Sequence, residues 1–420
     1  MAAVAAFFRT NQDSLLAFAA LSSERLLQMF VGLYVAGSIA RGFSHEHFAA
    51  WQVAFSMFVV VGTVCDIAHE RVVLPMLCGA EPGRLPTLWN SILVAKLLAG
   101  AASVLLILGW AASSGQLAVL PLAMLWAVYL FLGEPVSLAV YESYARGNFA
   151  WPQASRIAAM SLRLMVVVAV VAMQGGLLWM AAAWLAEILL LNLLLCRGWI
   201  RKRRFRPALI DWALVRWIFA QGCTLAIAAA ATVALVRIER LLLGDVVPAP
   251  VLAHYVASMN LLEAALAFSA TLLTVVGAKT LFKSGRISRG HHAQLVMFAV
   301  AIATLGAGLI VVIAPWVVVA VFGSDYAGSA TYLRIGAWLL PLAFAQAILQ
   351  APLLLRATRR FHLVKALTAL SICAMAASLA AVSGRHHLLS IGAYAGFLTL
   401  LTFDLLELRR RTGEIYHGRS

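Results

Sequence analysis

The segment "RGWIRKRRFR" (197–206) carries six basic residues in ten positions and lies near the middle of a 420-residue chain. Long apolar stretches lie on both sides of it. Cytoplasmic loops of membrane proteins are rich in Lys and Arg, so a basic run between two apolar halves is typical of a cytoplasmic connection. We therefore predict a basic linker over 200–211, which joins an N-terminal bundle (1–199) to a C-terminal bundle (212–420).

Hydrophobic residues make up 63% of the chain and charged residues only 12%, and the mean hydropathy is +0.92. A soluble globular domain is about half apolar and about a quarter charged, so this composition excludes a soluble protein. The start of the sequence lacks the basic segment, apolar core and small-residue cleavage site of a signal peptide. We expect an integral membrane protein that keeps its first span.

Apolar stretches of about 20 residues can cross the hydrocarbon core as helices. The sequence has such stretches in two sets of six, one set on each side of the linker. The predicted fold class is therefore an all-α integral membrane protein of about 12 transmembrane helices in two six-helix bundles. The predicted spans are 14–40, 47–77, 86–111, 117–142, 153–174, 177–199, 212–243, 251–278, 293–322, 328–355, 361–383 and 387–408.

The two halves of the sequence are similar to each other. "HFAAWQVAFSM" (47–57) aligns with "PVLAHYVASMN" (250–260) at an offset of 203 residues. Each segment follows a short loop and comes one helix into its half. Each half also begins with a helix that starts in the cytoplasm. Two such repeats are parallel, related by an axis along the membrane normal, so we predict two parallel six-helix bundles.

The connectors between spans sort by charge. One alternate set holds 22 of the 32 Lys and Arg residues, whereas the opposite set holds only Arg41 and Arg385. The positive-inside rule then places both termini in the cytoplasm, and we predict a multi-pass protein of the cell inner membrane. The net charge of +15 is thus a signal of orientation and of contact with anionic membrane lipids. No nucleic-acid partner is expected.

Several kinds of chemistry are missing from the sequence. It contains no G-x-x-x-x-G-K-[ST] and no H-E-x-x-H, and none of its five cysteines forms a C-x-x-C pair. The predicted external loops are too short to carry the catalytic groups of a glycan polymerase or ligase. We predict a secondary transporter that is not an enzyme, has no metal site and needs no cofactor.

Four blocks resemble the oligosaccharide flippases, the Wzx-like polysaccharide transporters of the MOP superfamily. The block "ERLLQMFVGLYVAGSIARGFSHEHFAAWQVAFSMFVVVGTVCDIAHERVVLPML" (24–77) is similar to their start. "RIERLLLG" (237–244) matches their "riD.ilLg" pattern, with Glu239 in place of the commoner Asp. "LAHYVASMNLLE" (252–263) matches "G.Y..a..l.e", with His254 in place of the usual glycine or small residue. "APWVVVAVFGSDYAGSATYLRIGAW" (314–338) matches "ap.i...lfG..y..a...l.i.a" and is the most specific of these second-half patterns.

The resemblance implies a flippase that moves a polyprenyl-diphosphate-linked oligosaccharide across the inner membrane by alternating access around a central cavity. Such proteins serve exopolysaccharide, capsule or O-antigen biosynthesis, and their expected partners are glycosyltransferases and a polysaccharide polymerase. The alternative is a cation-coupled multidrug exporter of the same superfamily. A membrane glycan polymerase or ligase is a third class, disfavoured by the short loops.

Charged residues inside the predicted spans are the candidate site. A charge at the bilayer centre costs about 2.5–3.5 kcal/mol on insertion scales, and arginine holds phosphate oxygens through a planar fork. The alternatives are snorkelling to headgroups for the pair Arg237 and Arg240, and ion pairs with Glu134, Glu187 or Glu263 for the isolated cations. The predicted substrate-binding residues are Arg25, Arg237, Arg240, Arg334, Lys96 and Arg163.

Two acidic residues are candidates for coupling transport to an ion. Glu24 is adjacent to Arg25 near the middle of the first span, and a structural ion pair is the alternative there. Asp66 is three residues before His69 and four before Glu70, so one helix face would carry several titratable groups. For Glu70 we favour packing at the cytoplasmic interface, and the role of Asp66 stays open.

Overall fold

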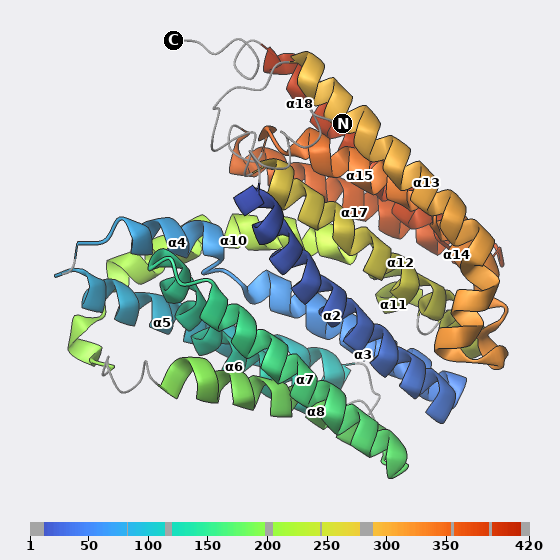
Figure 1. Ribbon diagram of the computed structural model, residues 1–420, viewed down its shortest axis with the longest axis horizontal. Coiled ribbons are helices and arrows are strands. Elements are labelled where there is room, and N and C mark those ends of the chain that lie inside the picture. Colours follow the sequence, from blue (N-terminus) through green and yellow to red (C-terminus); the bar gives the residue numbers. More distant parts are fainter. Residues whose placement is uncertain are drawn as a thin grey trace. The chain divides into compact units, whose positions relative to one another are not determined.

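The computed structural model describes residues 12–81, 83–113, 120–197, 205–243, 246–277, 289–353, 357–385 and 389–412. Within these ranges the chain is helical and has no β-strand, which confirms the predicted all-α fold class (Figure 1). For 12–25, 70–71, 243, 270–277 and 291 only the backbone is described.

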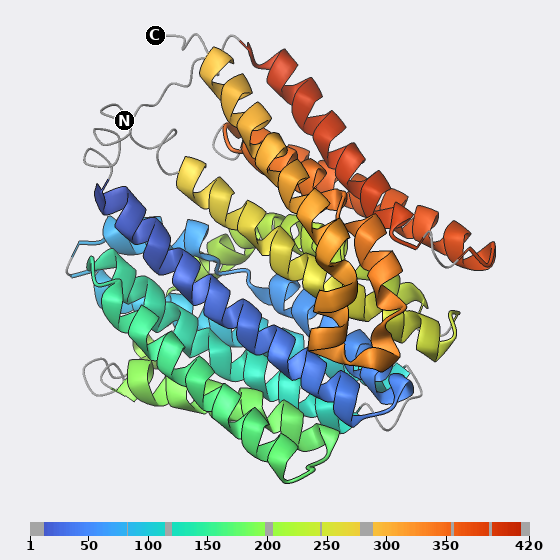
Figure 2. The same cartoon turned by 45° about the vertical axis from the view of Figure 1, so that its right-hand side comes forward.

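The helices of the first half follow the predicted spans closely. Four residues join α7 to α8, and this pair runs antiparallel (Figure 2). The elements are α2 (Gln12–Gly42), α3 (His45–Cys65), α4 (Glu70–Cys78), α5 (Leu85–Ser113), α6 (Leu120–Ala145), α7 (Ala150–Ala172), α8 (Leu177–Leu191) and the π-helix η2 (Asn192–Cys196).

The described residues of the second half are also helical. A 3-10 turn, η3 (Pro207–Leu209), precedes its first helix. The further elements are α10 (Trp212–Ala234), α11 (Ile238–Leu243), α12 (Ala249–Gly277), α13 (Arg289–Phe322), the 3-10 turn η5 (Ser324–Tyr326), α14 (Ser329–Gly336), α15 (Leu339–Gln350), α17 (Arg359–Val382) and α18 (Ile391–Arg410).

Length and composition show that the helices belong in a membrane. Eleven helical segments of the described chain are long and apolar enough to cross a bilayer, and Leu26–Gly42 of α2 is a shorter apolar stretch. The α13 span is the most apolar of them and also the least buried. Large side chains such as Phe298, Leu305 and Trp316 are exposed on α13, as expected of a helix that faces lipid. The protein is therefore a multi-pass membrane protein.

Three spans predicted as single helices are interrupted in the structure. The predicted span 47–77 breaks at 66–69, between α3 and α4. The span 212–243 breaks at 235–237, and 328–355 breaks at 337–338. These interruptions correct the prediction of continuous helices. Irregular backbone at membrane depth is tolerated where protein buries it or where it lines a cavity, so each break is a place where polar groups can gather.

Local chemistry accounts for each break. The carbonyl of Ile67 approaches α10 so closely that a Cβ on Gly222 would lie 1.9 Å from it, so only glycine fits there. The carbonyl of Leu235 accepts a hydrogen bond of 3.4 Å from the thiol of Cys373 on α17. Pro341 lies in the first turn of α15, where its missing N–H leaves no hydrogen bond unmade.

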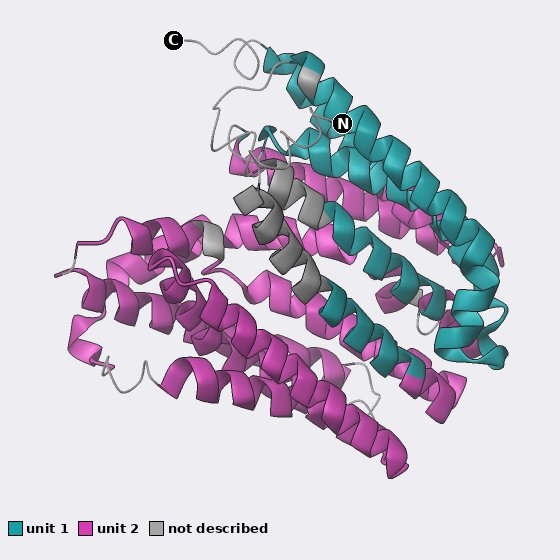
Figure 3. Cartoon of the chain, viewed as in Figure 1, with its two compact units in different colours: residues 1–37, 257–357, 397–420 teal, residues 38–256, 358–396 magenta. Residues whose placement is uncertain are grey.

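The chain forms two compact units, each made of segments from both halves of the sequence (Figure 3). Unit 1 is Met1–Gly37, Ala257–Ala357 and Phe397–Ser420, and unit 2 is Ser38–Val256 and Thr358–Gly396. In unit 2, α10 packs against α3, α5 and α17, and α5 packs against α6. In unit 1, α13 packs against α14 and α15. The division into six-helix bundles over 1–199 and 212–420 stays a prediction.

All five cysteines carry free thiols. Cys65, Cys196 and Cys373 are buried, Cys223 is half-buried and Cys78, the last residue of α4, is exposed. The buried thiols act as small core side chains, which is common for free cysteine.

Candidate functional site

Most of the predicted site residues lie in unit 2. Asp66, Lys96, Arg163, Arg237 and Arg240 all belong to it, and Arg334 belongs to unit 1. The predicted residues Glu24 and Arg25 fall on the backbone of α2, but their side chains lie outside the described residues. Unit 2 contains two ion-pair clusters and one arginine-bearing turn.

The first cluster joins α5 to α6. The ammonium of Lys96 donates a hydrogen bond of 3.2 Å to the carboxylate of Glu134, and the Lys96 side chain is fully buried. The two helices are antiparallel neighbours. Lys96 lies 11 residues after Leu85 and Glu134 lies 11 residues before Ala145, so at 1.5 Å per residue the two side chains sit at the same level.

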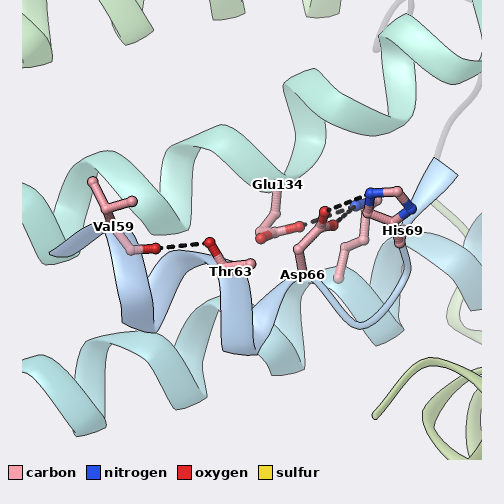
Figure 4. A network of polar contacts seen from close by, with 6 residues as sticks. Val59, Thr63, Asp66, His69 and Glu134 are labelled. Carbon is pink, nitrogen blue, oxygen red and sulfur yellow. Dashed lines mark hydrogen bonds and ion pairs between the residues drawn. The ribbon is translucent and has the colours of Figure 1, made fainter. Parts of the chain in front are cut away.

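Asp66 extends this cluster to the break after α3. Its carboxylate lies 3.7 Å from the Lys96 ammonium and 3.7 Å from the Nε2 of His69, at the other end of the break (Figure 4). Asp66 caps the C-terminus of α3, where its N–H donates to the carbonyl of Gly62. One lysine thus faces two carboxylates, with a histidine beside them.

The second cluster joins α7 to α8. The guanidinium of Arg163 donates a hydrogen bond of 2.7 Å to the carboxylate of Glu187, and both side chains are buried. The same guanidinium stacks on the ring of Trp184, 4.9 Å from its centroid, which adds a cation–π interaction. Arg163 lies nine residues before Ala172 and Glu187 lies ten residues after Leu177, so the hairpin again brings the charges level.

Aromatic side chains pack beside the second cluster. Trp51 of α3 lies 5.0 Å from Trp126 of α6, between ring centroids, and 5.7 Å from Trp184 of α8. Phe55 contacts Trp126 and Trp184 in the edge-to-face arrangement that aromatic pairs prefer. This aromatic core holds α3, α6 and α8 together in unit 2.

The stretch "LVRIERLLLG" (235–244) contains the break between α10 and α11. Arg237 is the last residue of the break and is half-buried, and its guanidinium lies 5.7 Å from the ring centroid of Phe55 on α3. Arg240, one turn later on α11, is fully buried. The prediction that both arginines belong to one continuous helix is wrong, because α10 ends at Ala234 and α11 begins at Ile238.

Glu239, the second residue of α11, forms a contact with α18. Its carboxylate accepts a hydrogen bond of 3.1 Å from the backbone N–H of Ala393, in the first turn of α18. A negative charge at a helix N-terminus is favourable because the first N–H groups have no intrahelical partner. Close packing completes the contact, since a Cβ on Gly392 would lie 2.7 Å from the carbonyl of Cys373.

Arg334 differs from the other cations. It lies in the last turn of α14, is exposed, and donates from its Nε to the carbonyl of Val311 at 3.1 Å. The sequence predicted it well inside a span. Because Arg334 is exposed, its position gives less reason to infer a function than that of a buried cation does.

The structure also adds buried polar groups that sequence reasoning missed. Glu142 of α6 accepts a hydrogen bond of 3.1 Å from the indole of Trp89 and pairs with Arg146. In unit 1, the buried carboxylate of Asp404 lies 3.5 Å from the side-chain amide of Gln346. For Glu142, the spacing of four residues from Arg146 on a helix was a usable signal. For Asp404 no local pattern pointed to Gln346.

Unit 2 thus holds two cations that are each paired with a glutamate, and a turn that carries two more arginines. Ion pairs at this depth stabilise helix packing only when the partners stay together, because a lone buried charge is costly. The turn between α10 and α11 differs from these ion pairs, because the regular backbone hydrogen bonds of α10 end there. Among the described His, Cys, Asp and Glu side chains, no group of three or more is placed to hold a metal ion.

Comparison with known proteins identifies the fold. No protein-family model and no curated protein sequence matches the chain. The lipid II flippase MurJ in an inward closed conformation is similar with a TM-score of 0.70 and 13% identity, over 94% of this chain and 90% of that one. An inward-facing multidrug resistance MATE family transporter of the MOP superfamily gives 0.71 and 14%, over 93% and 95%.

A third solved structure extends the likeness. A MOP superfamily transporter from Pyrococcus furiosus has a TM-score of 0.63 and 13% identity, over 94% of this chain and 96% of that one. The likeness covers nearly the whole length of each chain. The protein therefore has the fold of these MOP superfamily structures, which confirms the predicted fold.

Proposed function

We propose that this protein is a flippase for a polyprenyl-diphosphate-linked oligosaccharide. Its fold is shared with a lipid II flippase and with multidrug transporters, so the fold narrows the function to transport across a membrane. The choice of a lipid-linked oligosaccharide comes from the sequence blocks at 24–77, 237–244 and 314–338 and from the cations of unit 2.

The observation that carries the proposal is the arginine-bearing turn between α10 and α11. A diphosphate cannot enter hydrocarbon without cations, and Arg237 and Arg240 supply two guanidinium groups within one helical turn. Lys96 and Arg163 would first have to leave their glutamates, at a cost of several kcal/mol. We therefore rank Arg237 and Arg240 as the first diphosphate ligands and Lys96 and Arg163 after them.

The remaining predicted residues keep their places in the proposal. Arg25 on α2 and Arg334 on α14 are further candidate ligands for the diphosphate or the sugar hydroxyls. The protein would act in the inner membrane, with both termini in the cytoplasm. It would serve exopolysaccharide, capsule or O-antigen assembly, receive its substrate from glycosyltransferases and deliver it to a polymerase.

Leaflet exchange in liposomes tests the proposal. The purified protein is reconstituted with a fluorescent polyprenyl-diphosphate oligosaccharide, and a membrane-impermeant quencher reports the fraction in each leaflet. We expect exchange to require the protein and to fall sharply in Arg237→Ala. Arg216→Ala is the matched control, because Arg216 is an exposed arginine of the neighbouring helix α10.

The three outcomes separate the claims. Protein-dependent exchange that falls in Arg237→Ala and not in Arg216→Ala supports both the function and the ligand. Exchange that is equal in all three proteins assigns Arg237 to structure and leaves the flippase function standing. Absence of exchange by a folded protein overturns the proposal.

A cation-coupled multidrug exporter is the second candidate. It is favoured by the MATE transporters among the similar structures and by the carboxylates of Asp66 and Glu134, which give the Lys96 cluster an excess of negative charge. Uptake of a fluorescent cationic drug into the same liposomes, driven by an imposed ion gradient, tests it. Drug uptake without oligosaccharide exchange would replace the first candidate by the second.

A further inference from the structure

The cluster around Lys96 does not balance its charge. Two carboxylates, those of Asp66 and Glu134, face one ammonium at 3.7 Å and 3.2 Å. With both acids ionised and His69 neutral, the cluster carries one net negative charge within the span. Buried charge in low dielectric is unfavourable unless it is compensated, and one added proton makes this cluster neutral.

The exposed fraction of the side chains decreases along the cluster from His69 to Lys96. The side chain of His69 is 42% exposed and that of Asp66 is 34% exposed, whereas Glu134 is 14% and Lys96 only 1% exposed. The polar groups therefore form a continuous chain from an accessible histidine to a buried glutamate (Figure 4). Each step is short enough for a water molecule or a small side-chain movement to bridge.

Tyr141 and Cys65, two described neighbours of Lys96 and Glu134, do not supply the missing charge. The ring of Tyr141 on α6 lies 5.2 Å from the Lys96 ammonium, and the thiol of Cys65 lies within electrostatic range of Glu134 and of Cys223 on α10. These groups are neutral in their ordinary protonation states. The side chains of Glu70 and Arg71 on α4 lie outside the described residues.

We propose that Asp66, Lys96 and Glu134 form a proton-binding site, entered through His69, which holds one exchangeable proton. The site lies at the break between α3 and α4, so its protonation state acts on the backbone. With no proton bound, Asp66 and Glu134 both attract Lys96. With a proton on one carboxylate, that carboxylate is neutral and no longer attracts the ammonium. The electrostatic interaction between the 66–69 segment and Lys96 of α5 then changes.

The role of the proton rests on the proposed transport function, because the proton would drive or gate the movement of substrate. Its chemistry can be tested without transport. Infrared difference spectra between about pH 5 and about pH 8 show the C=O band of a carboxylic acid when a buried carboxylate takes up a proton. We expect such a band in the wild type and its loss in Glu134→Gln or Asp66→Asn.

Matched variants keep this test sharp. Glu134→Gln and Asp66→Asn keep the size of each side chain and mimic the protonated state, since either leaves one anion and one cation. Glu142→Gln is the control, because Glu142 lies on the same helix and is buried, but it pairs one carboxylate with one cation, Arg146. We expect the infrared band to persist in Glu142→Gln.

Transport then shows what the proton does. In liposomes, we expect oligosaccharide exchange by the wild type to follow a single-proton titration, with a change of at most about tenfold per pH unit. The expected profile of Glu134→Gln is flat, whereas that of Glu142→Gln follows the wild type. Thermal unfolding of each variant in detergent confirms that the proteins compared are folded.

The outcomes distinguish this inference from the proposed function. A band that is lost in Glu134→Gln or Asp66→Asn, in a wild type that exchanges no oligosaccharide, supports the proton site and overturns the flippase. Exchange without any band, or with a band that survives both variants, overturns the proton site and supports the flippase. A flat wild-type profile with the band present overturns the link between the proton and transport.

Discussion

The carboxylate of Glu239 accepts a hydrogen bond of 3.1 Å from the backbone N–H of Ala393, 154 residues later in the chain. The contact joins α11, just after the break that follows α10, to the start of α18 within unit 2. Glu239→Ala removes a buried acceptor, so we expect a loss of stability of about 1–3 kcal/mol. Glu239→Gln keeps an oxygen at this position and is expected to lose less. Thermal unfolding in detergent compares them, and equal losses would contradict the role of this hydrogen bond.

The Lys96 cluster predicts a strongly non-additive pair of substitutions. Asp66→Asn and Glu134→Gln each leave one cation facing one anion, so each single variant should unfold near the wild-type temperature. The double variant leaves the buried ammonium without a carboxylate, which costs about 3–5 kcal/mol when a buried pair is broken. Unfolding of the two singles and the double at neutral pH checks this. Additive effects would show that the three side chains do not act as one unit.

The Arg163–Glu187 pair predicts destabilisation of a different kind. Arg163→Met or Glu187→Gln alone should each lower stability, by about 3–5 kcal/mol for the arginine, because one charge stays buried without its partner. Replacement of both by apolar side chains should recover most of the loss. Stability measurements over the complete double-mutant cycle give the coupling energy, and a coupling near zero would count against a structural pair.

Gly222 provides a steric prediction about the break in the second span. A Cβ there would lie 1.9 Å from the backbone carbonyl of Ile67, so Gly222→Ala should destabilise the protein and disturb the Asp66 end of α3. A Cβ on Gly109 of α5 would meet no neighbouring atom of the described chain within 4 Å, so Gly109→Ala should be neutral or stabilising by about 0.5–1 kcal/mol. If the two alanines had the same effect, the close approach would be wrong.

Arg237 predicts a difference between two basic side chains. Arg237→Lys keeps the positive charge but loses the planar fork and the stacking on Phe55, so binding of a diphosphate should weaken. A charge-assisted hydrogen bond contributes about 1.5–3 kcal/mol, so we expect oligosaccharide exchange at limiting substrate to fall roughly tenfold or more. Exchange at the wild-type rate would show that charge alone suffices at this position.

The ends of most helices could be predicted from the sequence, because hydropathy decides where a chain enters and leaves the bilayer. The predicted span 86–111 corresponds to α5 (Leu85–Ser113), and 361–383 corresponds to α17 (Arg359–Val382). The interruptions could not be predicted in this way. Residues 66–69 and 235–237 lie inside long apolar stretches, and their backbone leaves the helix where it contacts α10 and α17.

The charged residues inside the spans could be identified from the sequence. Their ion-pair partners could not, because the pairing depends on how neighbouring helices are aligned along their axes. Lys96 and Glu134 are 38 residues apart, and only the lengths of α5, α6 and their loop bring them to one level. Arg163 and Glu187 meet for the same reason. Arg334 shows the opposite case, since a position inside an apolar segment does not fix whether neighbouring helices cover it. Its exposure depends on the packing of unit 1.

The exposed thiol of Cys78 offers a direct way to establish which side of the membrane the end of α4 faces. Cys78 is the exposed one among the five and ends α4, on a connector that the charge distribution assigns to the cytoplasm. A maleimide that cannot cross lipid should therefore label the native protein in inside-out vesicles and spare it in intact cells. The native sequence thus allows a test of how this connector is oriented in the membrane, without the introduction of a new residue.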